Sequence, residues 1–339
     1  MGFRVGFLAL LLLLSGQSPA GALYIYEMSN ASESGYGGAG LAARANDAGT
    51  VFTNPAGMTR FDDSAMLGGA IGVYIDGGFH TNAQNTASGG SGHVNKRIIP
   101  AGSFSYLRPI TDRWTVGVSA QNYFGLALDW PADWVGRESS VNVALLAPQL
   151  QPTMAYRVND WLSVGAGAAL TMGYLSDKLR QPALTPGDWP DGKTRISDTD
   201  YAVQGNFGIM LQPWEHTRIG LRYLTETDLD FKDEPQVNWR DPLGKALPDQ
   251  NVKLDLGVTM PQTVSLGVHH RWNDKLNVLG SVGWDEISEF GHVQVNIDDN
   301  GIPGVTLNED FRDTWHFGVA GEYQWTRDLE LTAGISYDT

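Results

Sequence analysis

The chain has 339 residues, enough for two modest soluble domains or for one large barrel. It contains no cysteine, so neither disulfides nor thiolate metal sites are available. The formal net charge of −15 argues against a nucleic-acid partner.

The first 22 residues have the three parts of a secretory signal peptide. Arg4 provides a positive charge, Val5–Leu14 form an apolar stretch, and Ser18-Pro19-Ala20 or Ala20-Gly21-Ala22 offers a small-residue cleavage site. A membrane-anchoring helix is the alternative, but about ten apolar residues are too few for the roughly 20 that span a bilayer. Residues 1–22 are therefore predicted to be removed on export.

From residue 64 onward, apolar and polar residues repeatedly alternate with the period of two that indicates strands. At ~3.3 Å per residue, the longest run, residues 114–130, is long enough to cross a membrane with tilt. Residues 162–174 and 201–211 repeat the pattern, whereas strands of a soluble β-sandwich usually have only ~5–6 residues. The predicted apolar face of the longest run carries Trp114, Val116, Val118, Ala120, Asn122, Phe124, Leu126, Leu128 and Trp130.

The connections between the strands alternate in length. Short turns rich in Asn and Asp are followed by long Pro-, Gly- and Asp-rich connections, near residues 76–96, 131–139, 176–199, 226–253 and 291–313. Tryptophans stand at or near strand ends, at Trp114, Trp130, Trp161, Trp214, Trp272 and Trp325. Short turns on one side, long loops on the other and aromatic girdles are typical of outer-membrane barrels. We therefore predict an all-β fold, a transmembrane outer-membrane β-barrel spanning residues 64–339.

The pattern contains about eleven strands, near residues 65–75, 97–108, 114–130, 140–156, 162–175, 199–211, 217–231, 254–271, 276–290, 314–325 and 329–338. Bacterial single-chain barrels have an even number of strands because both termini lie on the periplasmic side. An open edge in lipid also leaves backbone groups unpaired. The odd number predicts either that the chain is C-terminally incomplete or that one strand is missing from this count.

A Gly/Ala-rich segment precedes the first strand. Gly35–Gly40 matches the dinucleotide-binding pattern G-x-G-x-x-G, but no βαβ unit follows and no nicotinamide supply is expected outside the cytoplasm. The alternative is a Gly-rich stretch packed tightly inside the barrel, with a short helix at residues 41–45. We predict that residues 23–63 form a small hatch that plugs the lumen.

The hatch ends in Asn54-Pro55-Ala56, which by itself is only a turn signal. Behind an export signal and a Gly/Ala-rich segment, this motif resembles the hatch signature of the FadL-type outer-membrane transporters. The resemblance covers residues 23–339, and residues 334–338 resemble the eleventh of the family's fourteen strands. It implies passive transport of long-chain fatty acids or of aromatic or aliphatic hydrocarbons, without enzymatic activity or a cofactor.

The resemblance also implies roles for individual residues. In the family, the N-terminus reaches the bound ligand, and an inward kink of the third strand opens a lateral hole toward lipid. The residues at these two places are Leu23, Tyr24 and Ile25, and Asn122, Tyr123, Phe124 and Gly125. Gly125 suits such a bend, although a glycine merely tolerated on the lumen face is the alternative.

The expected ligand-binding charge is not in its place. Fatty-acid members have a basic residue near the end of the fifth strand, where this chain has Tyr174. Lys178 and Arg180 lie close by in the predicted outer loop, and with Tyr174 they are candidates for the ligand pocket. The candidate residues for capturing ligand in the outer loops are Trp134, Leu145, Leu146 and Trp189.

No metal site or catalytic group emerges from the spacing. His269 and His270 are adjacent on a strand and therefore face opposite sides. A general porin and a barrel-borne lipid hydrolase remain the alternative functions. The expected partners are a hydrophobic ligand, outer-membrane lipid and lipopolysaccharide, and the protein is expected to be a monomer in the Gram-negative outer membrane.

Overall fold

The computed structural model describes residues 33, 35–82, 84, 89–95, 97–181, 192–233, 236–238, 254–290, 292–297, 305–308 and 311–339. The predicted signal peptide lies outside the described residues. The ligand-contact candidates Leu23, Tyr24 and Ile25 and the capture candidate Trp189 also lie outside them.

Four short helical elements and eighteen strands make up the described chain. The helices are α4 (Leu41–Arg44), α5 (Thr50–Thr53), the 3-10 helix η1 (Pro55–Arg60) and α6 (Ile287–Phe290). The strands are β1 (Ala65–Ile75), β2 (Gly78–Phe79), β3 (Gly92–His93), β4 (Arg97–Pro109), β5 (Trp114–Asp129), β6 (Asn142–Arg157), β7 (Leu162–Gln181), β8 (Gly192–Trp214), β9 (Thr217–Leu224), β10 (Thr227–Asp233), β11 (Gln236–Asn238), β12 (Leu254–Met260), β13 (Thr263–Arg271), β14 (Leu276–Asp285), β15 (His292–Ile297), β16 (Val305–Asn308), β17 (Thr314–Gln324) and β18 (Glu330–Asp338).

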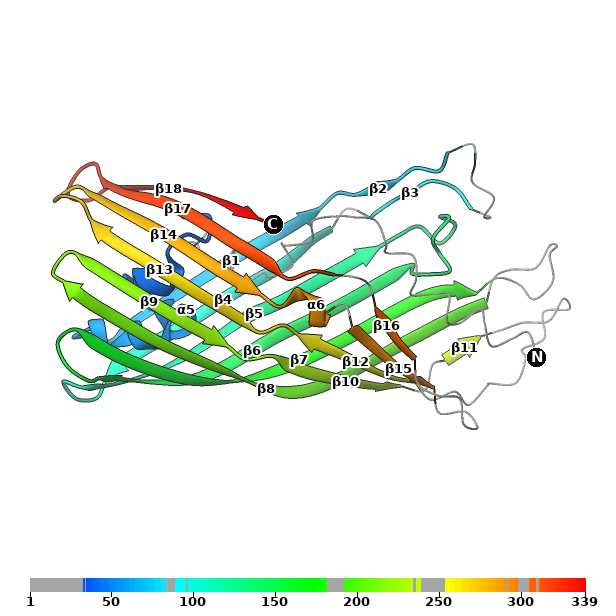
Figure 1. Ribbon diagram of the computed structural model, residues 1–339. Coiled ribbons are helices and arrows are strands. Elements are labelled where there is room, and N and C mark those ends of the chain that lie inside the picture. Colours follow the sequence, from blue (N-terminus) through cyan, green and yellow to red (C-terminus); the bar gives the residue numbers. More distant parts are fainter. Residues whose placement is uncertain are drawn as a thin grey trace, which may run out of the picture.

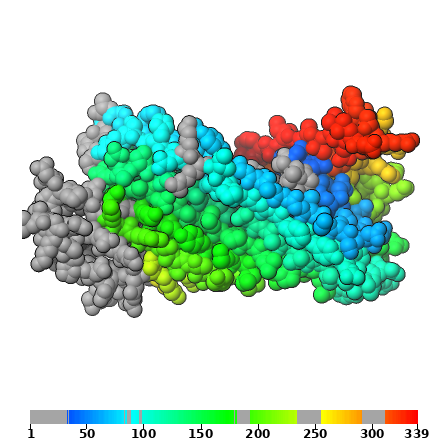
Figure 2. Space-filling model, turned by 180° about the vertical axis from the view of Figure 1, so that it is seen from behind, coloured from blue at the N-terminus to red at the C-terminus, as the bar shows by residue number. Residues whose placement is uncertain are grey.

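One antiparallel sheet forms the wall of the molecule. Its strands follow the order β1-β4-β5-β6-β7-β8-β9-β13-β14-β17-β18, and β11 pairs with β8 beside this path. The eleven strands of the path correspond to the eleven predicted from the sequence. Figure 1 shows the strands running side by side, with the short turns at one end and the long connections at the other. Figure 2 shows the face on which the red strands β17 and β18 lie beside the blue N-terminal residues.

Three predicted strands are divided where the wall meets a second sheet, ordered β10-β12-β15-β16. The predicted strand 217–231 is β9 and β10, the strand 254–271 is β12 and β13, and the strand 276–290 ends in α6. Strand β8 is joined to β10 through side chains. The Asp198 carboxylate accepts from the Lys232 N–H at 2.6 Å, and the Asp200 carboxylate accepts from the Asp230 N–H at 2.8 Å. Alternation alone does not show such a break, because the side-chain period continues across it.

The predicted outer loop 176–199 is shorter than expected. Strands β7 and β8 remain paired through Lys178↔Arg195 and Arg180↔Lys193 as far as Gln181↔Gly192. Placing Lys178 and Arg180 in a loop was therefore wrong, since both belong to β7. Polar residues do not end strand pairing, because the backbone ladder continues wherever a partner strand is present.

The wall is apolar outside and polar inside, the reverse of a soluble protein. The predicted outward positions of β7 and β8 are confirmed, with Leu170 48% and Val203 67% exposed, whereas Gln204 and Asn206 are completely buried. Five tryptophans near the short-turn end are also exposed, namely Trp114, Trp161, Trp214, Trp272 and Trp325. An apolar belt with aromatic girdles around a polar lumen suits strands that face lipid. No helix in the described part of the chain is long and apolar enough to cross a membrane.

Residues 35–60, here called the hatch, pack on the inner face of this wall (Figure 1). The predicted short helix is confirmed as α4, which begins after Gly40 in the left-handed conformation (φ 71°) and ends at Ala45 (φ 41°). Glycines of the wall strands give the hatch backbone room to approach. A Cβ atom added at any of them would lie too close to a hatch atom; these glycines are Gly165, Gly208, Gly220, Gly267, Gly318 and Gly334. The small residues of the strands thus fit the wall to the hatch.

Replacing one of these wall glycines should loosen the hatch. In Gly220→Ala the new Cβ would collide with the Ala42 carbonyl, so we expect the protein to lose about 1–3 kcal/mol of stability. Urea unfolding in detergent and the rate of proteolysis within the hatch would measure this. Gly280→Ala is the matched control, because its Cβ meets nothing nearer than the Gly318 carbonyl oxygen at 3.9 Å; equal effects of both variants would contradict the assignment.

Candidate functional site

Asn54 holds the hatch to the wall. It is completely buried and precedes Pro55, the first residue of η1. Its Oδ1 accepts from the Ala56 N–H at 3.1 Å, which caps the 3-10 helix. Its Nδ2 donates to the Ala42 carbonyl at 2.6 Å within the hatch and to the Ile209 carbonyl of β8 at 3.1 Å. The Asn-Pro-Ala motif therefore joins hatch to wall as well as turning the chain.

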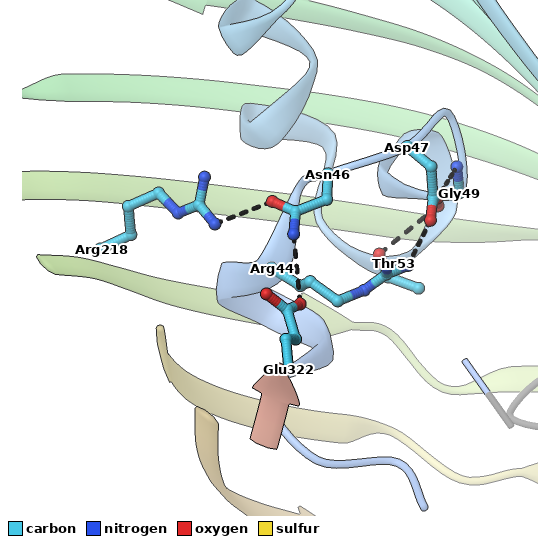
Figure 3. A network of polar contacts seen from close by, with 7 residues as sticks. All are labelled: Arg44, Asn46, Asp47, Gly49, Thr53, Arg218 and Glu322. Atoms are coloured by element: carbon cyan, nitrogen blue, oxygen red, sulfur yellow. Dashed lines mark hydrogen bonds and ion pairs between the residues drawn. The ribbon is translucent and has the colours of Figure 1, made fainter. Parts of the chain in front are cut away.

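A second set of contacts joins the hatch to strands β9 and β17 of the wall (Figure 3). Asn46 accepts from the Arg218 guanidinium of β9 at 2.9 Å and donates to the Glu322 carboxylate of β17 at 3.2 Å. Glu322 also accepts from Asn277 at 2.7 Å and lies 3.3 Å from His269 Nε2. The hatch amide thus lies between two wall charges of opposite sign.

Tyr36 belongs to the same surroundings. It is 3% exposed, and the Arg44 guanidinium lies 4.8 Å from its ring centroid. Burial and then the negative charge of Glu322 raise the pKa of the Tyr36 hydroxyl. The neutral phenol is thereby favoured beside the Glu322 carboxylate.

Above the hatch, side-chain amides form a belt around the inner wall. Gln149 of β6 accepts from Gln121 of β5 at 3.4 Å and donates to Gln204 of β8 at 2.7 Å. Just below, Asn206 donates to the Phe52 carbonyl at 2.7 Å and Gln151 donates to the Val51 carbonyl at 3.0 Å. The buried carbonyl groups of Val51 and Phe52 in α5 thereby have hydrogen-bond partners on the wall, as buried polar groups require.

An apolar cluster lies in this otherwise polar lumen. The lumenal apolar cluster combines residues of the hatch, of the wall and of the second sheet. It is formed by Phe52 of the hatch, by Tyr123, Phe124, Leu145, Ala147, Leu175 and Leu224 of the wall, and by Leu229, Phe231, Val258 and Met260 of β10 and β12. Phe52 meets Tyr123 edge to face at 6.3 Å, and Phe124 lies 5.6 Å from Phe290 of α6. Apolar side chains joined across hatch, wall and α6 offer a hydrophobic ligand an environment that the amide belt does not.

A β-bulge directs two aromatic residues of β5 into this cluster. The pairing of β5 with β6 skips from Asn122↔Pro148 to Phe124↔Ala147, so Tyr123 is the extra residue. Tyr123 is 0% and Phe124 2% exposed, and both point inward. The prediction that strict alternation continues through residues 114–130 was therefore wrong beyond Asn122. The irregularity lies at Tyr123, two residues before Gly125, to which the bend was attributed.

At the bulge, β4 and β5 separate. Their paired register ends at Ser103↔Gln121, and the Asn122 side chain accepts from the Gly102 N–H at 3.2 Å. At the far end the Asn95 N–H donates to the Asp129 carbonyl at 2.7 Å. We call the stretch between these two contacts the wall gap, and within it β5 remains paired with β6 only. The four predicted lateral-opening residues lie at its border.

The structure separates the other predicted pocket residues from the cluster. Tyr174 is half-buried between the buried residues Gly173 and Leu175, so its side chain lies on the opposite face of β7 from Leu175. Lys178 is exposed farther along the same strand, and the Arg180 N–H donates to the Arg137 carbonyl at 2.8 Å. These three residues are not brought together with Phe52.

The predicted capture residues divide in a similar way. Leu145 and Leu146 belong to strand β6 rather than to a loop, and Leu145 points into the lumenal apolar cluster. Trp134 stacks on Trp130 with a centroid separation of 4.3 Å, and Phe79 meets it edge to face at 6.1 Å. The two tryptophans and Phe79 form an aromatic surface at the end of the wall with the long connections.

Several residues of the site escaped the sequence analysis. Leu229 and Phe231 alternate with exposed Asp230 and Lys232, so the alternation of residues 227–233 contained the signal for an inward face. Phe52 gave no such signal, because a single aromatic residue in a Gly/Ala-rich segment does not reveal its contacts. In the part of the chain that the structure describes, no group of three or more His, Asp or Glu side chains is placed to hold a metal ion.

An apolar outer surface, a polar lumen and a packed plug define an outer-membrane β-barrel with a hatch. The family model for "Outer membrane protein transport protein (OMPP1/FadL/TodX)" matches residues 11–339, and the chain belongs to this family. It is accordingly an outer-membrane transport protein and not an enzyme.

Individual relatives agree with this assignment. Outer membrane protein P1 of Haemophilus influenzae strain Rd is 28% identical over 97% of this chain and 79% of its own. The long-chain fatty acid transport protein of Escherichia coli K12 is 23% identical over 92% of this chain and 78% of its own. Two solved structures share the fold. A Pseudomonas aeruginosa FadL homologue has a TM-score of 0.69 and 22% sequence identity, and the match covers 94% of this chain and 80% of that chain. The P. putida toluene transporter TodX has a TM-score of 0.71 and 17% identity, and the match covers 92% of this chain and 83% of that chain.

Removing the Asn54 side chain should free the hatch. Asn54→Ala leaves the buried Ala56 N–H and the Ala42 carbonyl without their partner, so we expect a loss of about 2–3 kcal/mol of stability, measured by urea unfolding. Asn159→Ala is the control, because Asn159 also accepts from two N–H groups, those of Trp161 and Leu162, but in an exposed turn where water can replace it. A loss in Asn159→Ala as large as that in Asn54→Ala would contradict the anchoring role.

Proposed function

We propose that the protein carries hydrophobic small molecules passively through the outer membrane, either long-chain fatty acids or aromatic or aliphatic hydrocarbons. The observation that carries this proposal is the lumenal apolar cluster, which lies between the hatch and the wall gap. Relatives named as transporters of long-chain fatty acid and of toluene support the chemical class. No energy source is required, because partition of an apolar solute into lipid is itself favourable.

The proposed route has three stages. Ligand first meets the aromatic surface of Phe79, Trp130 and Trp134 at the outer end. It then binds at the lumenal apolar cluster, where Phe52 of the hatch is part of the binding surface. Movement of the hatch segment, together with the residues before it, opens the path to the wall gap.

Lateral release has a physical rationale in the missing strand pairing. Across the wall gap no backbone ladder has to be broken, whereas elsewhere separation of two wall strands would leave several N–H and C=O groups unpaired in lipid. Tyr123 and Phe124 line the inner side of this exit. The acidic outer connections would meet lipopolysaccharide through divalent cations, and a monomer suffices for every step.

Deleting residues 23–58 tests the hatch. We expect the barrel to form, hydrophobic uptake to change, and ion conductance in planar bilayers to rise, because Asn54, Asn46 and Phe52 no longer fill the lumen. Uptake would be measured with labelled palmitate and toluene against the full chain. Unchanged uptake of both compounds would count against the proposal, and high conductance for small polar solutes in the full chain would favour a general porin.

Closing the wall gap tests lateral release. Because the chain has no native cysteine, Ile99→Cys and Leu126→Cys, on β4 and β5 in the gap region, can be joined by a bifunctional maleimide. We expect at least a tenfold slower uptake after cross-linking, since the exit can no longer widen. The two single-cysteine variants, treated with the same reagent, are the controls. Equal uptake in the cross-linked and control proteins would place the exit elsewhere.

A further inference from the structure

Strand β10 lies beside β8 without a backbone ladder between them. The pairing of β8 with β9 reaches only to Asn206↔Leu224, and at its outer end β8 pairs with β11 through Arg195↔Gln236. Among the described strands, β10 pairs only with β12 of the second sheet. We call the stretch of β8 and β10 between these two ladders the seam (Figure 1).

Side-chain carboxylates hold the seam together in place of a ladder. The carboxylates of Asp198 and Asp200 on β8 accept from backbone N–H groups of β10 at 2.6 and 2.8 Å. In the opposite direction, the Asp233 carboxylate of β10 accepts from the Ser197 N–H at 2.7 Å. The bonds of Asp198 and Asp200 lie at the exposed surface, where water can replace both partners. The seam therefore yields more readily than the laddered parts of the wall.

The residues of β10 behind the seam point into the lumenal apolar cluster. Leu229 is 0% and Phe231 1% exposed, and both belong to the cluster. They lie against Gly173 of β7, where an added Cβ atom would stand 2.7 Å from Leu229 and 3.0 Å from Phe231. A shift of β10 therefore changes the room that the cluster offers.

Both ends of β10 are fixed to β8. Toward the short turns, the Thr225 N–H donates to the Gly205 carbonyl at 2.9 Å, and the Gln204 side chain donates to the Thr225 carbonyl at 2.8 Å. Toward the long connections, β11 is laddered to β8. A strand that is held at both ends and fastened between them by replaceable bonds can bow without leaving the wall. Leu229 and Phe231 lie in the middle of this strand.

We propose that Asp198 and Asp200 are positioning residues for ligand binding, and that the seam makes β10 the adjustable side of the lumenal apolar cluster. The proposal rests on the proposed function, since it takes the cluster as the binding surface. With the seam closed, the inner face of β10 favours a slender saturated chain. When water replaces the bonds of the two carboxylates, β10 bows outward and admits a wider solute, such as a fused-ring aromatic hydrocarbon. The two carboxylates thus set the accepted width without touching the ligand.

The ligand itself offsets the cost of bowing. Moving Leu229 and Phe231 away from Gly173 exposes apolar surface to water, which is unfavourable, whereas a hydrophobic solute in the widened space covers that surface again. A wide ligand therefore stabilises the bowed strand and a slender ligand the straight one. Such a difference in affinity for two arrangements is what allows a ligand to shift their populations.

Fixing the seam tests the proposal. Because the chain has no native cysteine, Thr199→Cys on β8 and Lys232→Cys on β10, both exposed, can be bridged by a short bifunctional methanethiosulfonate. After bridging, we expect the Kd for labelled pyrene to rise at least about tenfold, while the Kd for labelled hexadecane changes less than about twofold. Reductant removes the bridge and should restore pyrene binding in the same protein sample.

Removing the carboxylates tests the two positioning residues. In the double variant Asp198→Ala and Asp200→Ala, we expect the Kd for hexadecane to rise about threefold and that for pyrene to fall about threefold, because the straight strand loses its bonds. The corresponding Asn pair should behave like the full chain, since an amide oxygen still accepts from the two N–H groups. Asp228→Ala is the matched control, because this carboxylate of β10 accepts from the Thr259 hydroxyl within the second sheet at 2.7 Å.

The accessibility of a buried cysteine gives a readout that needs no ligand. Val258 of β12 is 6% exposed and belongs to the cluster, so Val258→Cys reports on opening of the seam. We expect a maleimide to label it at least about tenfold faster when the two carboxylates are replaced by alanine. Equal labelling rates would overturn the proposal, as would a bridge that weakens both hydrocarbons alike or neither. Failure of the full chain to bind either hydrocarbon would instead refute the proposed function, and the labelling rates would still decide the role of the seam.

Discussion

Strands in lipid must pair with their neighbours, because the hydrocarbon offers backbone N–H and C=O groups no other partner. This constraint orders the eleven strands of the wall and makes each departure from pairing informative. Between Gly102–Asn122 and Asn95–Asp129 the ladder of β4 and β5 is missing, and the bulge at Tyr123 lies at the same place. The aromatic side chains that the bulge turns inward belong to the lumenal apolar cluster, so the gap in the wall and this part of the cluster arise at the same residue.

The lumen, in contrast to the apolar outer surface, is organised largely by polar side chains. Amides and charges fill its hatch-side half, where Asn54, Asn46 and the Gln121–Gln149–Gln204 belt satisfy each other and the hatch backbone. The apolar cluster lies beyond this belt and contains only one residue of the hatch, Phe52. The hatch also meets the wall through apolar contacts, since Val51 and Met58 pack with Leu107 and Ala155, and Ala45 and Ala56 pack with Met210.

Arg222 connects the two halves. Its guanidinium covers Phe52 and faces a cavity lined by Ser281 and His316, so one side chain contacts both the apolar and the polar environment.

The sequence alone determined the barrel class and the eleven wall strands, because alternation with a period of two and turn chemistry are local properties. It also indicated the hatch, because a segment rich in glycine and alanine has small side chains and can pack its backbone closely against neighbouring strands. The contacts of Asn54, the bulge at Tyr123, the division of β9 from β10, and the meeting of Phe52 with Arg222 were decided only by the tertiary structure. Each of these depends on which strands become neighbours around the lumen, and residues more than a hundred positions apart, such as Phe52 and Arg222, leave no periodic trace of their contact in the sequence.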